Sequence, residues 1–231
     1  PNPGNVASFD TPTTLVDGTY TYNVFITDQN APFCESILAE GEVTVNPLPD
    51  ATISLDVSTI LPEDKVCIDE ITTITFTGSL GTAPYTFEYT IDGGTTQTAY
   101  AIGTTVSIPI DTSTDGVFNY NLESVSDANG CSMPISGETV TIDVLPPPSL
   151  TVVNPDPICE DGTVDLSTTI TPFDNGVTYT YWNNIEATNA IVDPNVVGPG
   201  TYYIKATYNA PLPLCSSVVE VVVTGIALPE V

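Results

Sequence analysis

Five cysteines occupy two kinds of position in this 231-residue chain, and disulfide formation is the chemistry that their spacing favours. Cys67 and Cys159 each follow a short apolar run and precede a strand-like run. Cys34, Cys131 and Cys215 each follow a long aromatic segment and precede a valine-rich one. A pattern that recurs in this way predicts a tandem repeat. Regularly placed cysteines in a strand-rich chain indicate an oxidising, extracellular compartment.

Carboxylates near the cysteines are the second group that could do chemistry, because calcium takes oxygen ligands. Two acidic clusters of this kind are weak candidates for junctional Ca²⁺: Glu63, Asp64, Asp69 and Glu70 in one loop, and Asp156, Glu160 and Asp161 in the next repeat. No EF-hand or other defined calcium loop is present, and acids in loops are usually only solvated. We therefore expect no cofactor, with calcium as the one metal to test.

The chain offers few side chains that could catalyse a reaction. The chain contains no histidine, which excludes Ser-His-Asp and Cys-His arrangements. Carboxylate pairs are frequent, yet none stands in a recognisable glycosidase context. The cysteines are interpreted as structural rather than nucleophilic. We expect this chain not to be an enzyme.

The charge is strongly unbalanced. Lys65 and Lys205 are the only cations, and the formal net charge is -27. Such a chain repels nucleic acids and anionic membrane surfaces, which are bound through basic patches. No run approaches the roughly 20 apolar residues of a membrane helix, so membrane insertion is not expected.

Three segments of the chain align. Gly18, Gly116 and Gly200 each precede an aromatic strand-like run, and the next cysteine follows 16, 15 and 15 residues later. Proline-rich stretches after the valine-rich runs, at 46–49 and 145–148, mark linkers. These signals predict the end of one repeat in residues 1–48 and complete repeats in 49–146 and 147–231, in a window of a longer protein.

Alternation with a period of two dominates the chain and predicts antiparallel strands. In the middle repeat we expect seven strands, at 51–57, 71–78, 84–91, 97–102, 105–110, 117–126 and 138–145. In the last repeat, alternating residues at 164–170 and 177–181 predict a strand pair. Seven short strands in about 100 residues are typical of an Ig-like sandwich. The predicted fold is all-β, with tandem Ig-like antiparallel sandwiches in a linear rod.

Several short motifs stand out in the chain: Asn46-Pro-Leu-Pro49, Cys67, Ile74-Thr-Phe-Thr-Gly78 and Ser124-Val-Ser-Asp-Ala-Asn-Gly-Cys131. Together they resemble the tandem Ig-like repeats of Bacteroidota surface proteins. The chain is similar over its whole length to repeats of giant SprB-like gliding-motility adhesins, which are type IX secretion substrates; the last repeat diverges. The resemblance implies a cell-surface filament or stalk.

The disulfide pairing follows from strand direction in such a sandwich. Cys67 lies in an A–B loop at one end of its repeat, whereas Cys131 lies at the F–G loop of the other end. A strand of six to eight residues spans roughly 20–25 Å, and a disulfide needs Cα atoms within about 7 Å. We therefore favour an inter-repeat bridge from Cys67 to Cys215, with Cys34, Cys131 and Cys159 pairing outside this window. The alternative is pairing inside each repeat, Cys67 with Cys131 and Cys159 with Cys215.

Three functions remain open on the sequence. The first is a structural stalk whose partners are neighbouring repeats, with surface polysaccharide bound by distal parts of the protein. The second is a module that itself binds a carbohydrate or surface polymer, which would need an exposed aromatic row. The single Trp182 and the tyrosines are interpreted as core or strand-edge residues instead. The third is a spacer in a secreted enzyme.

Overall fold

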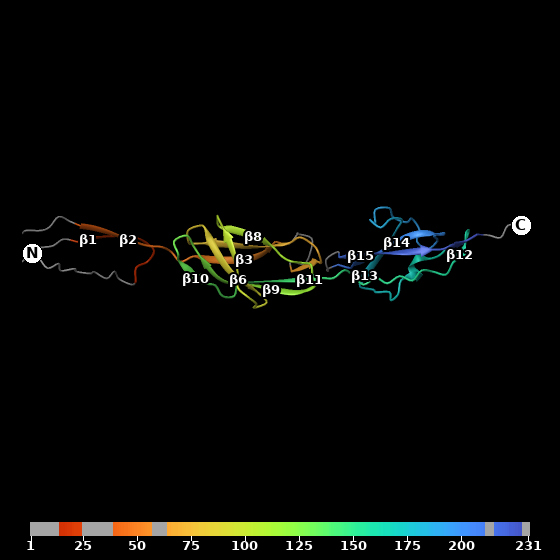
Figure 1. Ribbon diagram of the computed structural model, residues 1–231, viewed down its shortest axis with the longest axis horizontal. Coiled ribbons are helices and arrows are strands. Elements are labelled where there is room, and N and C mark those ends of the chain that lie inside the picture. The colour runs from red at the N-terminus through yellow and green to blue at the C-terminus, as the bar shows by residue number, and fades with distance from the viewer. Residues whose placement is uncertain (1–13, 25–38, 57–63, 211–214, 228–231) are drawn as a thin grey trace, which may run out of the picture.

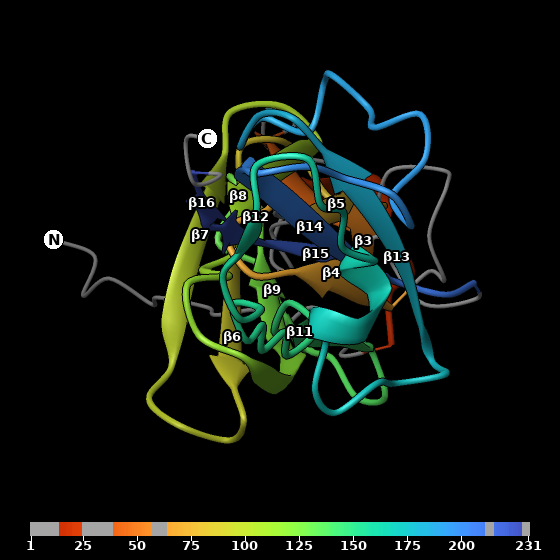
Figure 2. The same ribbon diagram turned by 90° about the vertical axis from the view of Figure 1, so that its right-hand side faces the viewer.

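The computed structural model describes residues 14–24, 39–56, 64–210 and 215–227, which form three units in line along the longest axis (Figure 1). The first unit is a hairpin of β1 (Gly18–Val24) and β2 (Ala39–Val45). A sandwich between residues 50 and 145 and a smaller unit between residues 150 and 226 follow. Viewed along this axis, the units project over one another, which is the arrangement of a rod (Figure 2).

The middle unit is an Ig-like sandwich of two sheets. One sheet contains, in spatial order, β3 (Asp50–Asp56), β5 (Thr73–Ser79) and β8 (Thr105–Pro109). The other contains β4 (Lys65–Cys67), β11 (Thr139–Leu145), β9 (Gly116–Ser126), β6 (Tyr85–Ile91) and β7 (Gln97–Ala101), with β10 (Ser132–Pro134) on β9. All seven strands expected from the alternation are present, and the all-β prediction is confirmed.

The short strand β4 corrects one expectation. Cys67 was expected in a loop, but it ends a strand that pairs in parallel with β11, where Val66 lies opposite Val144 and Cys67 opposite Leu145. The strand forms because the Val66 side chain packs into the core, where it is only 3% exposed. The first strand of the sandwich is therefore split, with β3 in one sheet and β4 in the other.

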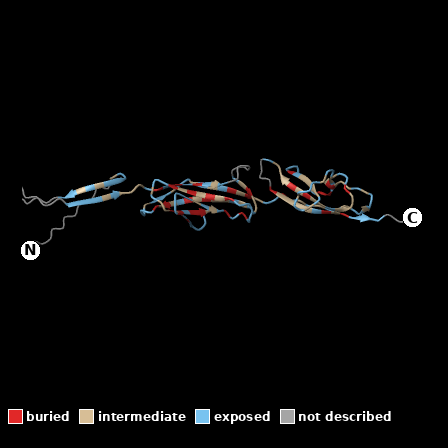
Figure 3. Cartoon of the chain, turned by 90° about the horizontal axis from the view of Figure 1, so that it is seen from above, coloured by how far each residue is buried: buried red, intermediate tan, exposed pale blue. Residues whose placement is uncertain are grey.

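Aromatic rings fill the space between the two sheets. The ring centroids of Phe76 and Phe87 are 5.5 Å apart, and those of Phe76 and Tyr89 are 5.0 Å apart. Burying each such side chain is worth about 1.5–3 kcal/mol. Buried residues concentrate in this middle unit, and the β1–β2 hairpin has none (Figure 3).

The C-terminal unit has one regular sheet. It consists of β13 (Val177–Trp182), β14 (Gly200–Tyr208) and β15 (Ser216–Val223), all antiparallel, and a parallel pair joins β12 (Ile158–Cys159) to β16 (Gly225–Ile226). Leu166, Ile204 and Val221 are fully buried in its core. On the opposite side of this core, the described residues form isolated β-bridges, such as that between Val152 and Ile170, and no regular sheet.

The strand expected at 164–170 is wrong. Leu166–Thr169 form a single 3₁₀ turn, η1, because the Asp165 carboxylate caps it by accepting from the Ser167 N–H at 2.8 Å. Asp, Ser and Thr side chains favour such local hydrogen bonds over a sheet ladder. Leu166 still reaches the core from this turn, as the alternation required.

Three prolines, Pro146 to Pro148, connect the sandwich to the C-terminal unit. The Ser217 hydroxyl donates to the Pro148 carbonyl at 2.7 Å and ties this linker to β15. Among the described residues, no hydrogen bond or ion pair runs directly between the two units. The described helical segment, η1, is too short to cross a membrane.

Candidate functional site

A disulfide joins the middle and C-terminal units. The sulfurs of Cys67 and Cys215 are bonded at 2.05 Å and the Cα atoms are 5.4 Å apart, although 148 residues separate them in the chain. The structure thus brings together the two cysteines that strand direction favoured. Cys131 and Cys159 are free, so the alternative bonds within each unit are not formed. Cys34 lies outside the described residues.

Cys67 is held by hydrogen bonds at the end of β4. The Ile68 N–H donates to the Leu145 carbonyl at 3.0 Å, and the Glu70 N–H donates to the Cys67 carbonyl at 3.2 Å. Beside it, the Lys65 ammonium and the Asp143 carboxylate form an ion pair at 2.7 Å between β4 and β11. The hydrogen bond to Asp143 raises the pKa of Lys65 above 10.5, so this lysine is charged at neutral pH.

Cys159 is held in the same way at the end of the C-terminal unit. It lies opposite Ile226 in a parallel pair, as Cys67 lies opposite Leu145. The Glu160 N–H donates to the Ile226 carbonyl at 3.0 Å, and the Gly162 N–H donates to the Cys159 carbonyl at 2.8 Å. These two bonds reproduce those around Cys67. Cys159 is exposed and free.

Cys131 and Cys215 form the second equivalent pair. The Asp127 N–H donates to the Cys131 carbonyl at 3.0 Å, and the Tyr208 N–H donates to the Cys215 carbonyl at 3.2 Å. Both cysteines therefore lie just after a long strand, on the return to the next. The middle and C-terminal units each carry one cysteine beside their last strand and one after the long strand.

A buried carboxylate orders the loop around Cys131. Asp127 is 8% exposed and accepts from the N–H groups of Thr82, Asn129 and Cys131 at 2.9, 3.0 and 2.9 Å. The Thr82 hydrogen bond, reinforced by the other two, lowers the pKa of Asp127 below its ordinary value of 3.8. Asp127 belongs to the Ser124–Cys131 motif of the sequence, but the motif did not predict this role.

The acidic clusters do not converge on a metal position. Among the described residues, no group of three carboxylate, cysteine or histidine side chains is close enough to hold an ion. The Glu70 carboxylate is used locally, since it accepts from the Cys67 N–H at 3.0 Å. Asp64 acts through its carbonyl, which accepts from the Asp143 N–H at 2.6 Å. Asp69, Asp156, Glu160 and Asp161 join no such group, and Glu63 lies outside the described residues.

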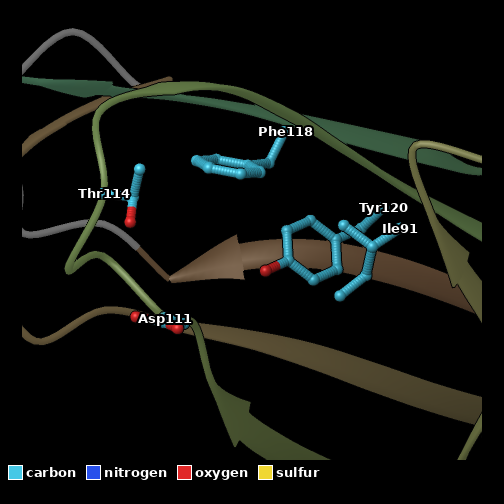
Figure 4. Close-up of a pocket in the computed structure, with 5 residues that line it drawn as sticks. All are labelled: Ile91, Asp111, Thr114, Phe118 and Tyr120. Carbon is cyan, nitrogen blue, oxygen red and sulfur yellow. The ribbon is translucent and has the colours of Figure 1, made fainter.

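An apolar cavity of about 330 Å³ opens in the middle unit, lined by Ile91, Asp111, Thr114, Phe118 and Tyr120 (Figure 4). Asp111 accepts from the Ser113 N–H and hydroxyl, whose hydrogen bonds lower its pKa below 3.8. Burial raises the pKa of Tyr120 above 10.0. At neutral pH this lining thus presents an ionised carboxylate, a neutral phenol and apolar surface. No nucleophile and base face each other there.

The aromatic residues form no row on the described surface. Tyr85, Tyr89 and Tyr120 are buried, and Trp182 is half-buried with its indole N–H donating to the Thr180 hydroxyl at 2.9 Å. The exposed aromatic side chains of the described residues are Tyr100 in the middle unit and Phe173 in the C-terminal unit. Two isolated rings on different units do not make a sugar-binding platform.

Comparisons with known proteins give structural neighbours only. Neither a protein-family model nor the sequence of a curated protein matches this chain. Among solved structures, the eight N-terminal Ig domains of Down syndrome cell adhesion molecule match 89% of this chain at 16% identity, with a TM-score of 0.37. Domains 4–9 of the surface layer protein SbsC match 91% at 14% identity, with a TM-score of 0.25.

A CARDB domain from Pyrococcus furiosus matches 43% of this chain at 14% identity, with a TM-score of 0.26. The chain spans 28% of the adhesion-molecule fragment and 36% of the surface-layer fragment. These values are too low for an argument about function. What the chain itself establishes is an all-β protein of tandem Ig-like units, two of which are joined by a disulfide.

Proposed function

We propose that this chain is a stalk segment of an extracellular bacterial surface protein, in which Ig-like repeats project a distal binding part. The single observation that carries the proposal is the Cys67–Cys215 bond, which joins consecutive units at a second point besides the proline linker. Two attachment points remove the hinge freedom that one flexible linker would leave. A stiff rod is what a stalk requires, and structural disulfides belong to oxidising compartments.

We further propose that residues 1–48 end one repeat and that residues 49–146 and 147–231 are complete repeats. The free cysteines are proposed to bond to other repeats of the full protein. Cys159 has the hydrogen-bonded setting of Cys67, and Cys131 has that of Cys215. We assign Cys159 to a bond with the following repeat and Cys131 to a bond with the preceding one. Cys34, which is aligned with Cys131 in sequence, is assigned to an earlier repeat.

We further propose that this surface protein is a SprB-like gliding-motility adhesin exported by the type IX secretion system. It is supported by the sequence motifs around Asn46–Pro49 and Ser124–Cys131. A net charge of -27 suits a surface filament that must not adhere along its own length. Neighbouring repeats of the same chain are its partners, and any surface polysaccharide is bound elsewhere in the protein.

The test is immunogold labelling of intact cells of the source bacterium with antibodies against residues 64–210. Gold particles at a distance from the outer membrane, in a protein of many such repeats, support the stalk. Label that appears only after the cells are lysed overturns it. A full-length protein with one to three repeats beside a catalytic domain favours the spacer alternative. Binding of the isolated segment to a glycan array favours the binding-module alternative.

A further inference from the structure

The disulfide between Cys67 and Cys215 changes the shortest covalent path through the chain. A chain pulled at both ends without this bond carries tension through every residue from Asp50 to Ile226. With the bond, the path leaves the middle unit at Cys67 and rejoins the chain at Cys215, 148 residues later. Residues 68–214 then lie on a closed loop, and a loop attached at one covalent point cannot be extended by its ends.

The short path that remains is made largely of strand. In the middle unit it passes through β3 and β4, of seven and three residues, and in the C-terminal unit through β15 and β16, of eight and two residues. A strand rises about 3.3 Å per residue, which is close to the maximum reach of a chain. These strands are therefore already close to full extension, and tension can lengthen this path only slightly.

Most of both cores lies on the closed loop. Strands β5 to β14 and the buried residues Phe76, Phe87 and Ile204 all fall between Cys67 and Cys215. Tension on the ends therefore acts on β3 and β4 at one edge of the middle unit and on β15 and β16 in the other. Most of the buried core of each unit is therefore not on the covalent path that carries the tension.

We propose that the Cys67–Cys215 bond is a load bypass, which keeps both units folded when the protein is pulled along its axis. The bypass rests on the proposed stalk function only for the origin of the tension, since its topology belongs to the chain itself. Such a device limits how far the rod lengthens without requiring either unit to be mechanically strong.

The proposed bonds of Cys131 and Cys159 to other repeats would extend this scheme in the full protein. Both cysteines lie inside the closed loop, so residues 131–159 would become part of a second load path beside the first. The two load paths would then be linked by residues 68–130 in the middle unit and by residues 160–214 in the C-terminal unit. The strands from β5 to β9, and from β13 to β14, lie in these linking segments and would carry no load along either path.

The test is single-molecule force spectroscopy on the 231-residue chain held by its two ends, with free thiols alkylated. We expect the fully stretched oxidised chain to be shorter than the Cys67→Ser/Cys215→Ser variant by about 500 Å, since 148 residues contribute roughly 3.3–3.6 Å each. This length does not depend on whether the variant folds. Adding a reductant under force should release the same length in a single step.

The matched control is Cys131→Ser/Cys159→Ser, which keeps the bond and should retain the short length. Equal stretched lengths for the oxidised chain and the Cys67→Ser/Cys215→Ser variant would overturn the bypass. Extension of residues 68–214 before any reductant is added would overturn it too. Neither result depends on where the protein lies in the cell, so the bypass and the stalk function can fail separately.

Discussion

Phe118 occupies in the middle unit the position that Tyr202 occupies in the C-terminal unit, two residues after a glycine at the start of a strand. The Tyr202 hydroxyl donates to the Gly198 carbonyl, four residues earlier, at 3.0 Å. Tyr20 in the hairpin does the same to Val16 at 2.9 Å. Phe118 has no hydroxyl, and Thr114, four residues before it, lines the cavity beside its ring (Figure 4). The hydrogen bond that Tyr202 makes to the carbonyl four residues earlier is the tyrosine corner of Ig-like folds, and Phe118 cannot make it.

We predict that Phe118→Tyr stabilises the middle unit. The added hydroxyl would lie beside the cavity that Phe118 and Thr114 line. The bonds of Tyr202 and Tyr20 indicate the carbonyl four residues earlier, here that of Thr114, as its acceptor. A net hydrogen bond is worth about 0.5–1.5 kcal/mol. Urea denaturation followed by the fluorescence of the protein should show a higher midpoint at an unchanged m-value. Tyr202→Phe is the matched control and should lose a similar amount in the C-terminal unit. A lower midpoint for Phe118→Tyr would mean that a hydroxyl at this position does not form the corner bond.

Removing the bond between the units should make the rod bend. We predict that Cys67→Ser/Cys215→Ser keeps its strand content but loses its fixed length, because the proline linker alone then joins the units. Small-angle X-ray scattering should give a smaller mean radius of gyration and a broader distance distribution. The Cys131→Ser/Cys159→Ser variant, which keeps the bond, should scatter like the parent chain. Identical curves for all three proteins would mean that the linker is rigid by itself.

The stability of the middle unit should depend on pH through Asp127. Because the pKa of Asp127 is lowered below 3.8 in the folded protein, its ionised form stabilises the fold above that pH. This contribution is lost as the pH falls through the folded pKa. Asp127→Asn should cost about 1–3 kcal/mol at pH 7, because its amide group would face a backbone N–H donor.

The pH series separates this effect from a general loss of packing. The difference between Asp127→Asn and the parent should shrink below pH 3.8, as the parent carboxylate becomes protonated. Denaturant midpoints measured from pH 7 to pH 2.5 give this difference directly. Asp161→Asn, at an exposed position, should follow the parent throughout. A constant difference across the series would assign Asp127 a role that does not depend on its charge.

The Lys65–Asp143 pair should contribute little at neutral pH. Both side chains are about a quarter exposed, at 26% and 25%, and partly exposed pairs are worth about 0.2–1 kcal/mol. Lys65→Met should lower the free energy of unfolding by that amount in low salt and by less in 1 M salt. Since the pKa of Lys65 is raised, the contribution persists up to pH 10.5 and is lost as the pH rises through the folded pKa. A loss that salt leaves unchanged would indicate packing of the lysine stem instead.

Much of the middle unit could be predicted from local patterns. Alternation of buried and exposed residues, as in Ile74 and Phe76 between threonines, directly reports which face of a strand enters a core. The C-terminal unit was harder, because Asp165 caps a 3₁₀ turn where alternation indicated a strand. Short segments of this kind are decided by one hydrogen bond that a periodic pattern does not register. Strand β4 was missed for a related reason, since three residues are too few to show a period.

An acidic all-β chain of tandem units could be read directly from the amino-acid order, because alternation, turn residues and cysteine spacing are local properties of the chain. Strand direction in a sandwich further favoured the Cys67–Cys215 bond over pairing inside each repeat. Which cysteines meet became certain only with the fold, because Cys67 and Cys215 are 148 residues apart and their contact depends on how two units are joined end to end. The cavity beside Phe118 was likewise visible only in the fold, because it depends on how residues far apart in the chain pack together.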